Sequence, residues 1–231
     1  MSNRLELIAS LIPDGVGVAD VGTDHAYLPM LLAGHGYRGN ITATDINEAP
    51  LKKARNNLID AGLDSRVELV LCDGLDGCDP EKTDTVVIAG MGGDTITGIL
   101  DRAEWCAGPG ISLILQPATK SEILRYWLVN NGFVITKELI TEENSVLYQI
   151  ICAEAGEYVR YSDAELYTGR YEQIKDSPYF KRLVTSLIKR FESAVGGLTV
   201  NKRGGLDAWL AINETILEEL REMNRQNEDR K

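Results

Sequence analysis

One stretch near the N-terminus constrains the fold of this chain more than any other. Residues 16–28 read Val-Gly-Val-Ala-Asp-Val-Gly-Thr-Asp-His-Ala-Tyr-Leu, an apolar run that carries an acid at Asp20 and breaks at Gly22. A helix-compatible run begins at Ala26. A strand, a glycine turn and a helix open the nucleotide site of doubly wound α/β domains, because ligands bind there beyond the carboxyl ends of parallel strands. A plain strand-to-helix connection is the alternative.

Acids stand at the ends of the next two predicted strands. Residues 41–44 form a short apolar strand that ends at Asp45, 23 residues after Gly22, and a helix follows to about residue 61. A carboxylate at this place can accept hydrogen bonds from both hydroxyls of a ribose, and we expect Asp45 to do so with Ile46 beside it. A solvated helix cap is the alternative for Asp45.

The third predicted strand, residues 67–72, ends in Asp73-Gly74-Leu75. An acid just past this strand can accept a hydrogen bond from the amino group of an adenine, while neighbouring backbone and apolar groups flank the ring. The alternative is an Asp-Gly turn, which is common in any protein. Spacing alone leaves both interpretations open.

A glycine-rich turn, Ala89-Gly90-Met91-Gly92-Gly93, follows the fourth strand at residues 85–88. Three glycines in four positions let another group approach the backbone closely. In a doubly wound sheet this strand lies beside the first one, so its turn should border the same pocket. The turn is not a phosphate-binding P-loop, because no Gly-Lys-Ser/Thr follows it.

A fifth strand and a C-terminal hairpin are predicted to complete the sheet. The fifth strand, residues 111–115, ends in Gln116-Pro117, and a helix is predicted over residues 122–129. Apolar runs at 133–140 and 145–152 are too close for a helical crossover, so they form an antiparallel hairpin.

Five β-α units capped by a hairpin are typical of class I S-adenosylmethionine-dependent methyltransferases, which have a Rossmann-like doubly wound sheet. A nicotinamide dehydrogenase would usually have G-x-G-x-x-G after the first strand. Asp24 and Ala26 stand here where further glycines would be, which disfavours a pyrophosphate at that turn. A sulfonium ligand has no phosphate and needs polar acceptors instead.

The character of the chain changes after Gly156. Apolar residues recur at steps of three and four over residues 180–195, where Gly196-Gly197 should break the pattern, and again after Gly204-Gly205. Two such helices with a short connection predict an antiparallel helical hairpin of coiled-coil type. We therefore expect a cofactor-binding domain at residues 1–155 and a helical extension at 156–231.

The distribution of charge suggests a role for that extension. The net charge of −11 comes entirely from residues 1–155, while residues 156–231 carry 13 basic and 13 acidic side chains. An acidic protein binds nucleic acid poorly overall, because phosphate attraction is the largest sequence-independent contribution. The basic residues of this extension could still dock RNA locally, namely Lys181, Arg182, Lys189, Arg190, Lys202 and Arg203. The alternative is two packed helices and nothing more.

Other site types and locations are poorly supported. The four cysteines are scattered without a C-x-x-C, and the chain has two histidines, so no metal site is expected. No apolar run approaches the roughly 20 residues that cross a bilayer. The N-terminus lacks the layout of a secretion signal, so a cytoplasmic location is expected. A monomer is the expected oligomeric state.

In its motifs the chain resembles the bacterial tRNA (adenine-22-N1)-methyltransferase family. The resemblance covers about residues 4–155 in order, while the extension matches in architecture more than in letters. Its motifs are Arg4-Leu5 with Ile8-Ala9, Asp20-Val21-Gly22-Thr23-Asp24-His25-Ala26-Tyr27-Leu28-Pro29, Ala89-Gly90-Met91-Gly92-Gly93, Leu115-Gln116-Pro117, Leu124-Arg125-Tyr126-Trp127-Leu128 and Tyr148-Gln149-Ile150.

The resemblance implies methyl transfer from S-adenosylmethionine to N1 of adenine 22 of tRNA, with S-adenosylhomocysteine as the product and no metal. Ala118 stands where the family tends to carry an asparagine, and Thr119 or Gln116 are the candidates to replace that amide. The residues expected to bind the cofactor are Asp20, Gly22, Thr23, Asp45, Ile46, Asp73, Gly74, Leu75, Gly90 and Met91. Those expected to bind the substrate are Tyr27, Gly92, Gln116, Pro117, Lys189 and Arg190.

Asp24 and His25 are the expected catalytic residues, because they follow the turn nearest the methyl group. Asp24 could accept a hydrogen bond from the adenine amino group and balance the positive charge that develops as N1 is alkylated. The alternative is that these side chains cap the helix that starts at Ala26.

Two other functions stay open from the residues alone. One is a methyltransferase for another RNA, a protein or a small molecule, with the helical hairpin as a lid or dimer contact. The other is a non-catalytic RNA- or partner-binding module on a nucleotide-binding fold, which the glycine turn and the two strand-end acids disfavour.

Overall fold

The computed structural model describes the backbone of residues 3–200 and 207–230, and the side chains of these residues except 198–200 and 207. The strands are β1 (Val18–Val21), β2 (Ile41–Asp45), β3 (Glu68–Leu71), β4 (Thr85–Gly92), β5 (Ser112–Thr119), β6 (Phe133–Glu143) and β7 (Val146–Ala155). The α-helices are α1 (Asn3–Ser10), α2 (Tyr27–Gly34), α3 (Glu48–Asp60), α4 (Gly93–Arg102), α5 (Ser121–Asn130), α6 (Asp163–Thr168), α7 (Tyr171–Ile174), α8 (Phe180–Val200) and α9 (Asp207–Glu228).

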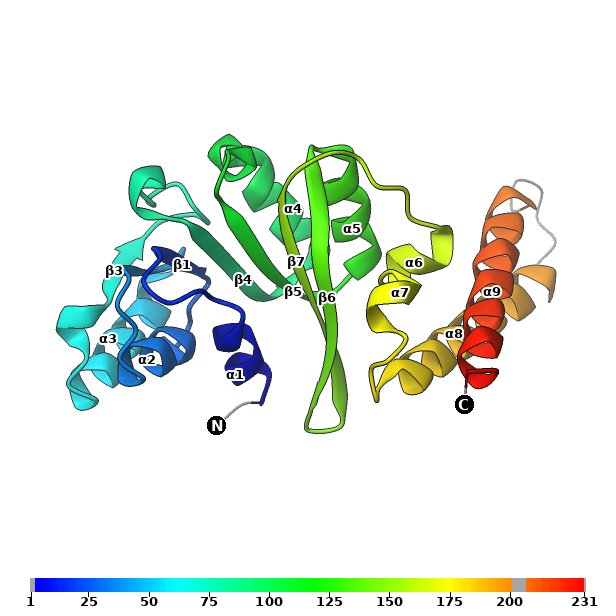
Figure 1. Cartoon of the computed structure of the whole chain (residues 1–231), viewed down its shortest axis with the longest axis horizontal. Helices are drawn as coiled ribbons and strands as arrows, with labels where there is room; N and C mark the ends of the chain where they lie inside the picture. The colour runs from blue at the N-terminus through cyan, green and yellow to red at the C-terminus, as the bar shows by residue number, and fades with distance from the viewer. Residues whose placement is uncertain (1–2, 201–206, 231) are drawn as a thin grey trace. The chain divides into compact units, whose positions relative to one another are not determined.

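Seven strands form one sheet in the order β3-β2-β1-β4-β5-β7-β6 (Figure 1). Strands β1 to β5 pair in parallel, and β7 enters antiparallel between β5 and β6. The order reverses between β1 and β4, which is the topological switch point where open α/β sheets bind ligands. The predicted Rossmann-like doubly wound sheet with a C-terminal hairpin is confirmed.

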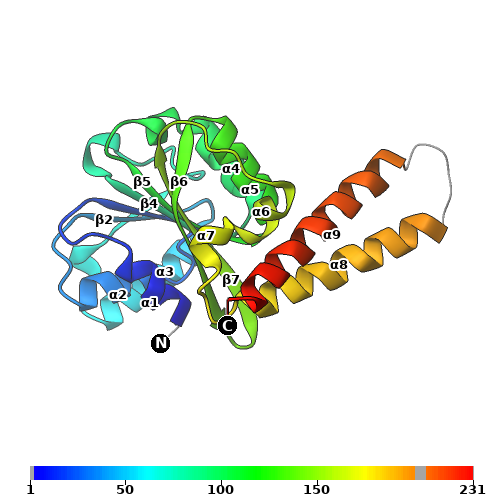
Figure 2. The same cartoon turned by 45° about the vertical axis from the view of Figure 1, so that its right-hand side comes forward.

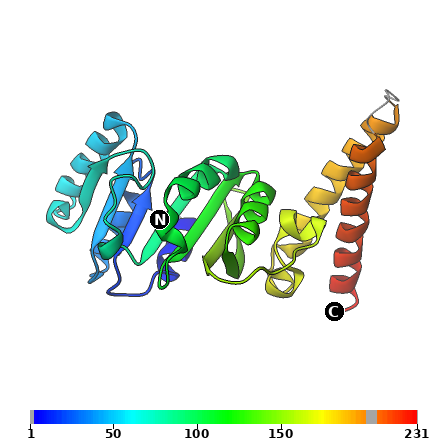
Figure 3. The same ribbon diagram turned by 90° about the horizontal axis from the view of Figure 1, so that it is seen from above.

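Helices cover both faces of this sheet. Helices α1, α2 and α3 lie on one face and α4 and α5 on the other (Figure 1), with the early elements at one end of the sheet and the later ones toward the other (Figure 3). The central strands are apolar and buried because both faces are covered, as parallel strands require. Val86, Val87 and Ile88 of β4 have no exposed surface.

Four strands are longer than the apolar runs predicted. Strand β4 continues through the glycine turn to Gly92, with a bulge at Gly90, and β5 continues through Pro117 to Thr119. The hairpin strands also extend, so that only Asn144 and Ser145 remain as the turn. Both have positive φ (50° and 65°), the conformation of a two-residue type I′ hairpin turn.

The helical extension has its own buried side chains. Helices α8 and α9 run side by side in an antiparallel pair (Figure 2), with Phe180 and Val184 of α8 and Leu220 of α9 at most 1% exposed. The predicted helical hairpin is therefore present. The prediction of a break at Gly196-Gly197 is wrong, because α8 runs through both to Val200. Lys202, Arg203 and Gly204-Gly205 lie outside the described residues.

Two compact units make up the chain. One comprises residues 1–137 and 141–159, and the other comprises 138–140 and 160–231. The second unit therefore includes a short piece of β6, where Glu138 accepts a hydrogen bond from the backbone N–H of Arg170 (2.6 Å). The division at 155/156 stays a prediction. Within the described part of the chain, no helix has the length and apolarity needed to span a membrane.

Candidate functional site

A pocket of about 470 Å³ lies at the carboxyl ends of β1, β2 and β4 and beside the turn after β3. Six of the ten residues predicted to bind the cofactor line it. Its lining is Val21, Gly22, Thr44, Asp45, Ile46, Asn47, Asp73, Gly74, Met91, Asp94, Thr95, Gly98, Ile99 and Arg102. This volume lies within the range of about 300–1,000 Å³ that is usual for small-molecule sites.

Gly22 forms the turn at the end of β1, where the pocket meets the backbone. Its φ is +73°, and a Cβ added there would lie 2.2 Å from Cε of Met91. No other residue type meets both conditions without strain. A ligand can therefore approach the backbone at Gly22 closely if the flexible Met91 side chain, its nearest neighbour, moves aside.

Asp45 ends β2 and lines the pocket. Its Oδ1 accepts a hydrogen bond from the backbone N–H of Asn47 (2.8 Å), which starts the turn into α3. The predicted helix-start role and the predicted ribose role are compatible, because a carboxylate has two oxygens and about four acceptor positions. Ile46 beside it is 60% exposed and offers an apolar surface to a ring.

Asp73 and Gly74 follow β3 and line the adenine side expected from the sequence. The Thr44 hydroxyl donates to the carbonyl oxygen of Gly74 (2.9 Å), which ties this turn to β2. Asp73 is exposed and forms an ion pair with Arg102 of α4 (Oδ1 to Nη2, 2.9 Å). Arg102 is not among the predicted site residues, because the sequence does not indicate which distant residue a polar side chain at the end of a helix will meet.

Asp20 and Thr23 flank Gly22 in the chain and are both 7% exposed. Burial raises the pKa of the Asp20 carboxyl to about 6, and the neighbouring Thr23 hydroxyl offsets this only in part, without reaching hydrogen-bonding geometry. The Thr23 hydroxyl oxygen has no hydrogen-bond partner among the described residues. A buried polar atom without a partner costs free energy, so a bound polar ligand at this turn would stabilise it.

Four of the predicted cofactor residues do not line this pocket, namely Asp20, Thr23, Leu75 and Gly90. Leu75 is buried at 3% exposure, directly behind Gly74 in the chain. Gly90 is exposed and sits in the bulge of β4 with φ +85°. Bulges next to active sites re-aim the strand end.

Asp24, His25 and Ala26 form a strained loop between Gly22 and α2, and Tyr27 is the exposed first residue of that helix. Asp24 and Ala26 have positive φ (50° and 58°), which non-glycine residues rarely adopt. Nε2 of His25 lies 3.5 Å from Oδ2 of Asp24, and its ring stacks on that of Tyr27 with centroids 5.3 Å apart. The Asn57 side chain holds the loop by donating to the carbonyl oxygen of His25 (3.0 Å).

The helix-capping alternative for Asp24 and His25 is not found. Helix α2 begins at Tyr27, and its N-cap residue, Ala26, lacks a side-chain cap hydrogen bond. The Asp24 side chain is 64% exposed. Strain of this kind persists where the surrounding structure imposes it, and it clusters at functional loops. The catalytic role of both residues stays a prediction.

Gln116 and Pro117 in β5 were expected to face a substrate, but the structure places them in the interior. Both are buried, because β5 continues through them and pairs with β4. The Gln116 side chain accepts a hydrogen bond from Arg4 and donates one to the carbonyl oxygen of Pro117 (2.9 Å). Ala118 and Thr119, the next two residues, are exposed. A direct substrate contact by either buried side chain requires a rearrangement and stays a prediction.

Packing explains part of the glycine run after β4. A Cβ on Gly93 would lie 2.1 Å from the carbonyl oxygen of Lys120, so the chain after β5 approaches here. A Cβ on Gly92 would lie 2.7 Å from Oδ1 of Asp94, the end of a flexible side chain, and 3.4 Å from the hydroxyl oxygen of Thr119. The Lys120 ammonium bonds Asp94 (2.6 Å) and holds the pKa of that carboxyl below its usual value.

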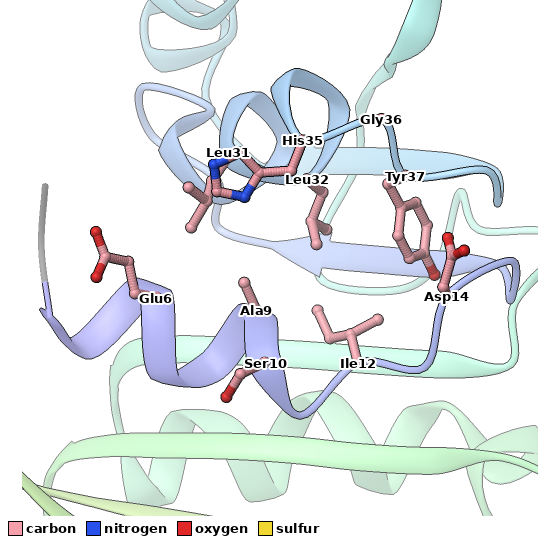
Figure 4. A pocket seen from close by; sticks show the side chains of 10 residues that line it. All are labelled: Glu6, Ala9, Ser10, Ile12, Asp14, Leu31, Leu32, His35, Gly36 and Tyr37. Atoms are coloured by element: carbon pink, nitrogen blue, oxygen red, sulfur yellow. The ribbon is translucent and has the colours of Figure 1, made fainter.

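A second cavity, of about 460 Å³, lies between α1 and α2 (Figure 4). Ala9 and Ile12 point toward Leu31 and Leu32 across it. It contains none of the predicted site residues and is not at the carboxyl ends of the strands. Its lining is Glu6, Ala9, Ser10, Ile12, Asp14, Leu31, Leu32, His35, Gly36 and Tyr37.

The predicted RNA-binding pair belongs to the helical unit. Lys189 and Arg190 are exposed on α8. The Arg190 guanidinium lies 5.6 Å from the ring centroids of both Tyr167 and Phe191, so its stem is held against the helical core. Among the described residues, no group of three or more His, Cys, Asp or Glu side chains is arranged to hold a metal ion.

Comparisons with known proteins agree on the class of protein. A family model described as a methyltransferase domain matches residues 1–151. The chain is 34% identical to the tRNA (adenine(22)-N(1))-methyltransferase of Bacillus subtilis (strain 168) over 157 residues, 68% of this chain and 66% of that enzyme, just under two thirds of its length.

Solved structures match nearly the whole chain. A Streptococcus pneumoniae protein crystallised with S-adenosyl-L-methionine has a TM-score of 0.83 and 29% identity, covering 97% of this chain and 99% of that one. The M. capricolum protein TrmK, in complex with S-adenosyl-homocysteine, has a TM-score of 0.80 and 25% identity, covering 97% and 98%. The similarity therefore includes the helical extension.

Proposed function

Because this chain belongs to the methyltransferase-domain family, and within it to the bacterial tRNA (adenine-22-N1)-methyltransferases, we propose that it transfers a methyl group from S-adenosylmethionine to N1 of adenine 22 in tRNA. The observation that carries the proposal is the pocket at the sheet's switch point, where Gly22, Asp45 and Asp73 meet. A glycine turn, a ribose-type acid and an adenine-type acid together fit an adenosyl group better than a phosphate.

The residues present fit this cofactor. The Thr23 hydroxyl, buried and without a partner among the described residues, supplies an unused polar group beside the turn. The Asp20 carboxyl supplies a buried negative charge that a cationic ligand would stabilise. When bound, the cofactor supplies an electrophilic methyl group on a sulfonium centre. Asp20, Gly22, Thr23, Asp45, Ile46, Asp73, Gly74, Leu75, Gly90 and Met91 are the residues we assign to holding it.

The protein's main task is orientation. N1 of adenine has a free lone pair, so the transfer needs no general base, and holding the partners in line supplies roughly 7–11 kcal/mol of the barrier. Asp24 accepts a hydrogen bond from the adenine amino group and balances the charge that develops on the ring. His25, 3.5 Å from that carboxylate and stacked on Tyr27, holds the loop in place.

The substrate must present an edge that base pairing hides. Enzymes that modify such an edge bind an open conformer or extrude the nucleotide, and extruded bases stack on aromatic side chains. Tyr27 is 58% exposed at the start of α2 and can take this role. Gly92 and Thr119 would border the side of the site where the target adenine enters. Lys189 and Arg190 dock the tRNA backbone. A tRNA substrate also implies that the reaction takes place in the cytoplasm.

The test is methyl transfer itself. The full-length protein is incubated with methyl-labelled S-adenosylmethionine and unmodified tRNA, and the digested nucleosides are separated. Label in 1-methyladenosine that disappears when adenine 22 is replaced by guanine supports the proposal. Label in another nucleoside, or incorporation that is unchanged by the replacement, refutes the stated position. No incorporation by a protein that binds the cofactor refutes the activity on tRNA.

A further inference from the structure

We propose that Arg4, which lies on α1 and reaches the ends of β4 and β5, binds a backbone phosphate of the target nucleotide. The inference rests on the proposed function, since it names the group that recognises the tRNA at that site. Arg4 lies outside the cofactor pocket and is not among the residues predicted to bind substrate.

Three elements hold the Arg4 guanidinium. Its Nη1 donates to the buried amide oxygen of Gln116 in β5, and its Nε lies 3.5 Å from Oε2 of Glu143 at the end of β6. The guanidinium also sits over the ring of Tyr148 in β7, 5.0 Å from its centroid. The buried Gln116 thus acts by orienting Arg4, because its own amide is committed on both ends.

The held guanidinium borders open space above the end of β4. Among the described residues, and apart from its chain neighbours, a Cβ added to Gly90 would have one neighbour within 4 Å, Nη1 of Arg4 at 3.9 Å. Gly90 is exposed and opposes the end of β5 through its neighbour Ala89, which pairs with Gln116. The charge therefore lies where the proposed function requires the nucleotide to enter.

The cations near the site differ in how closely they are paired with carboxylates. Arg102 and Lys120 are paired with carboxylates at 2.9 and 2.6 Å. The Glu143 carboxylate is farther from Arg4, at 3.5 Å, and Nε has no hydrogen-bond partner among the described residues. The carboxylate contact of Arg4 is therefore longer than those of Arg102 and Lys120, which suits a guanidinium that exchanges this partner for a phosphate.

A phosphate is the ligand that this chemistry favours. A guanidinium is always charged and binds phosphate oxygens in a fork geometry. Contact with the adenine ring would be unfavourable, because methylation at N1 makes the ring cationic. An extruded nucleotide carries its flanking phosphates with it to the site. In a domain whose sequence is strongly acidic, such a cation would offset local repulsion of the tRNA.

The experiment compares Arg4→Gln, Arg4→Lys and Glu143→Gln with an Arg38→Gln control, which removes an exposed arginine paired with Asp14. Binding of unmodified tRNA is measured at several salt concentrations, together with KM for tRNA and affinity for S-adenosylmethionine. We expect Arg4→Gln to weaken tRNA binding about tenfold and to lower the salt slope by about 1, as loss of one phosphate contact does. Arg4→Lys should restore the slope and only part of the affinity.

Glu143→Gln gives a change of opposite sign. Removing the competing carboxylate should strengthen tRNA binding about twofold to threefold, with cofactor affinity unchanged. A protein destabilised by loss of the Arg4 network would instead bind both ligands more weakly in both variants. That result, or an unchanged salt slope in Arg4→Gln, overturns the inference. If the wild-type protein binds tRNA but does not methylate it, the proposed function is refuted. The salt dependence of tRNA binding, compared between wild type and Arg4→Gln, still tests whether Arg4 binds a phosphate.

Discussion

Arg102 places its Nη2 2.9 Å from Oδ1 of Asp73 at the edge of the cofactor pocket, and its Nε 3.9 Å from Oδ1 of Asp76. The carboxylate predicted to accept the adenine amino group is therefore already oriented by a cation from α4. This arrangement fixes the Asp73 rotamer before a ligand arrives, which lowers the entropy cost of binding.

Replacement of Arg102 by glutamine should weaken S-adenosylmethionine binding about threefold to fivefold. The effect is small because both side chains are half exposed, and exposed ion pairs contribute about 1 kcal/mol or less. Calorimetric titration with the cofactor checks this, with Arg38→Gln as the control on an exposed pair elsewhere. Tighter binding in Arg102→Gln would mean that the arginine competes with the adenine instead of orienting its acceptor.

Asp45→Ala should weaken cofactor binding by about 1–3 kcal/mol, the cost of losing hydrogen bonds to a charged acceptor. Asp45→Asn keeps an acceptor for the N–H of Asn47 and so separates the turn from the ribose contact. We expect Asn to preserve the melting temperature and still lose cofactor affinity. Equal cofactor affinity in wild type and Asp45→Ala would remove the ribose role.

The raised pKa of Asp20 makes stability depend on pH. Its folded-state pKa of about 6 lies above the ordinary 3.8, so the folded protein binds more protons than the unfolded chain between these values. Stability should therefore fall by about 3 kcal/mol as pH rises from about 4 through 6. Asp20→Asn should lack this step and be more stable than wild type at pH 7.5, measured by denaturant unfolding across pH.

Cofactor binding should show the opposite trend with pH. If the Asp20 carboxylate compensates the positive charge of S-adenosylmethionine, affinity rises as pH increases through 6, because the ligand favours the ionised form. Asp20→Asn should bind with an affinity that is flat over this range and weaker at pH 8. A wild-type affinity that is independent of pH between 5 and 7.5 would argue against the contact.

Gly93→Ala should destabilise the protein by about 1–3 kcal/mol, because its Cβ would lie 2.1 Å from the carbonyl oxygen of Lys120. Gly34→Ala is the matched control, at a helical position where an added Cβ would meet none of the described residues within 4 Å, and it should be neutral or slightly stabilising. Thermal unfolding of both variants distinguishes close packing from general intolerance of glycine replacement.

Lys189→Gln should weaken tRNA binding at low salt and reduce the salt slope by about 1. Lys189 is preferable to Arg190 for this test, since Arg190 also packs on Tyr167 and its removal would disturb the helical core. Lys52→Gln on α3 serves as the charge-matched control. Equal slopes for wild type and Lys189→Gln would exclude this part of α8 from the tRNA interface.

The sequence could predict that certain strand-end residues meet at one pocket, because their signals are local. A glycine or an acid that ends an apolar run is visible in the sequence, and parallel strands bring their ends together, as Gly22, Asp45 and Asp73 show. Arg4 and Arg102 could not be found this way. Both lie on helices, where periodicity indicates a buried face but not which distant residue a polar side chain will meet.

The predicted ends of strands and helices were wrong where tertiary packing overrode the local preference of the sequence. Gly90 and Pro117 suggested that their strands had ended, yet β4 and β5 continue past them with register shifts. Gly196-Gly197 suggested a helix end, yet α8 passes through both. Gln116 was expected to bind the substrate at the end of its strand, and the longer β5 instead buries its side chain.

The left-handed backbone at Asp24 implies a conflict between the thermal stability of the protein and its catalytic rate. A non-glycine residue in that conformation costs on the order of 1 kcal/mol, which glycine would recover at an exposed position. Mutant libraries screened only for survival of heating will therefore accumulate glycine at position 24. If its carboxylate holds the target base as proposed, those survivors will be hardier proteins and poorer enzymes, and the two screens will enrich different sequences at this loop.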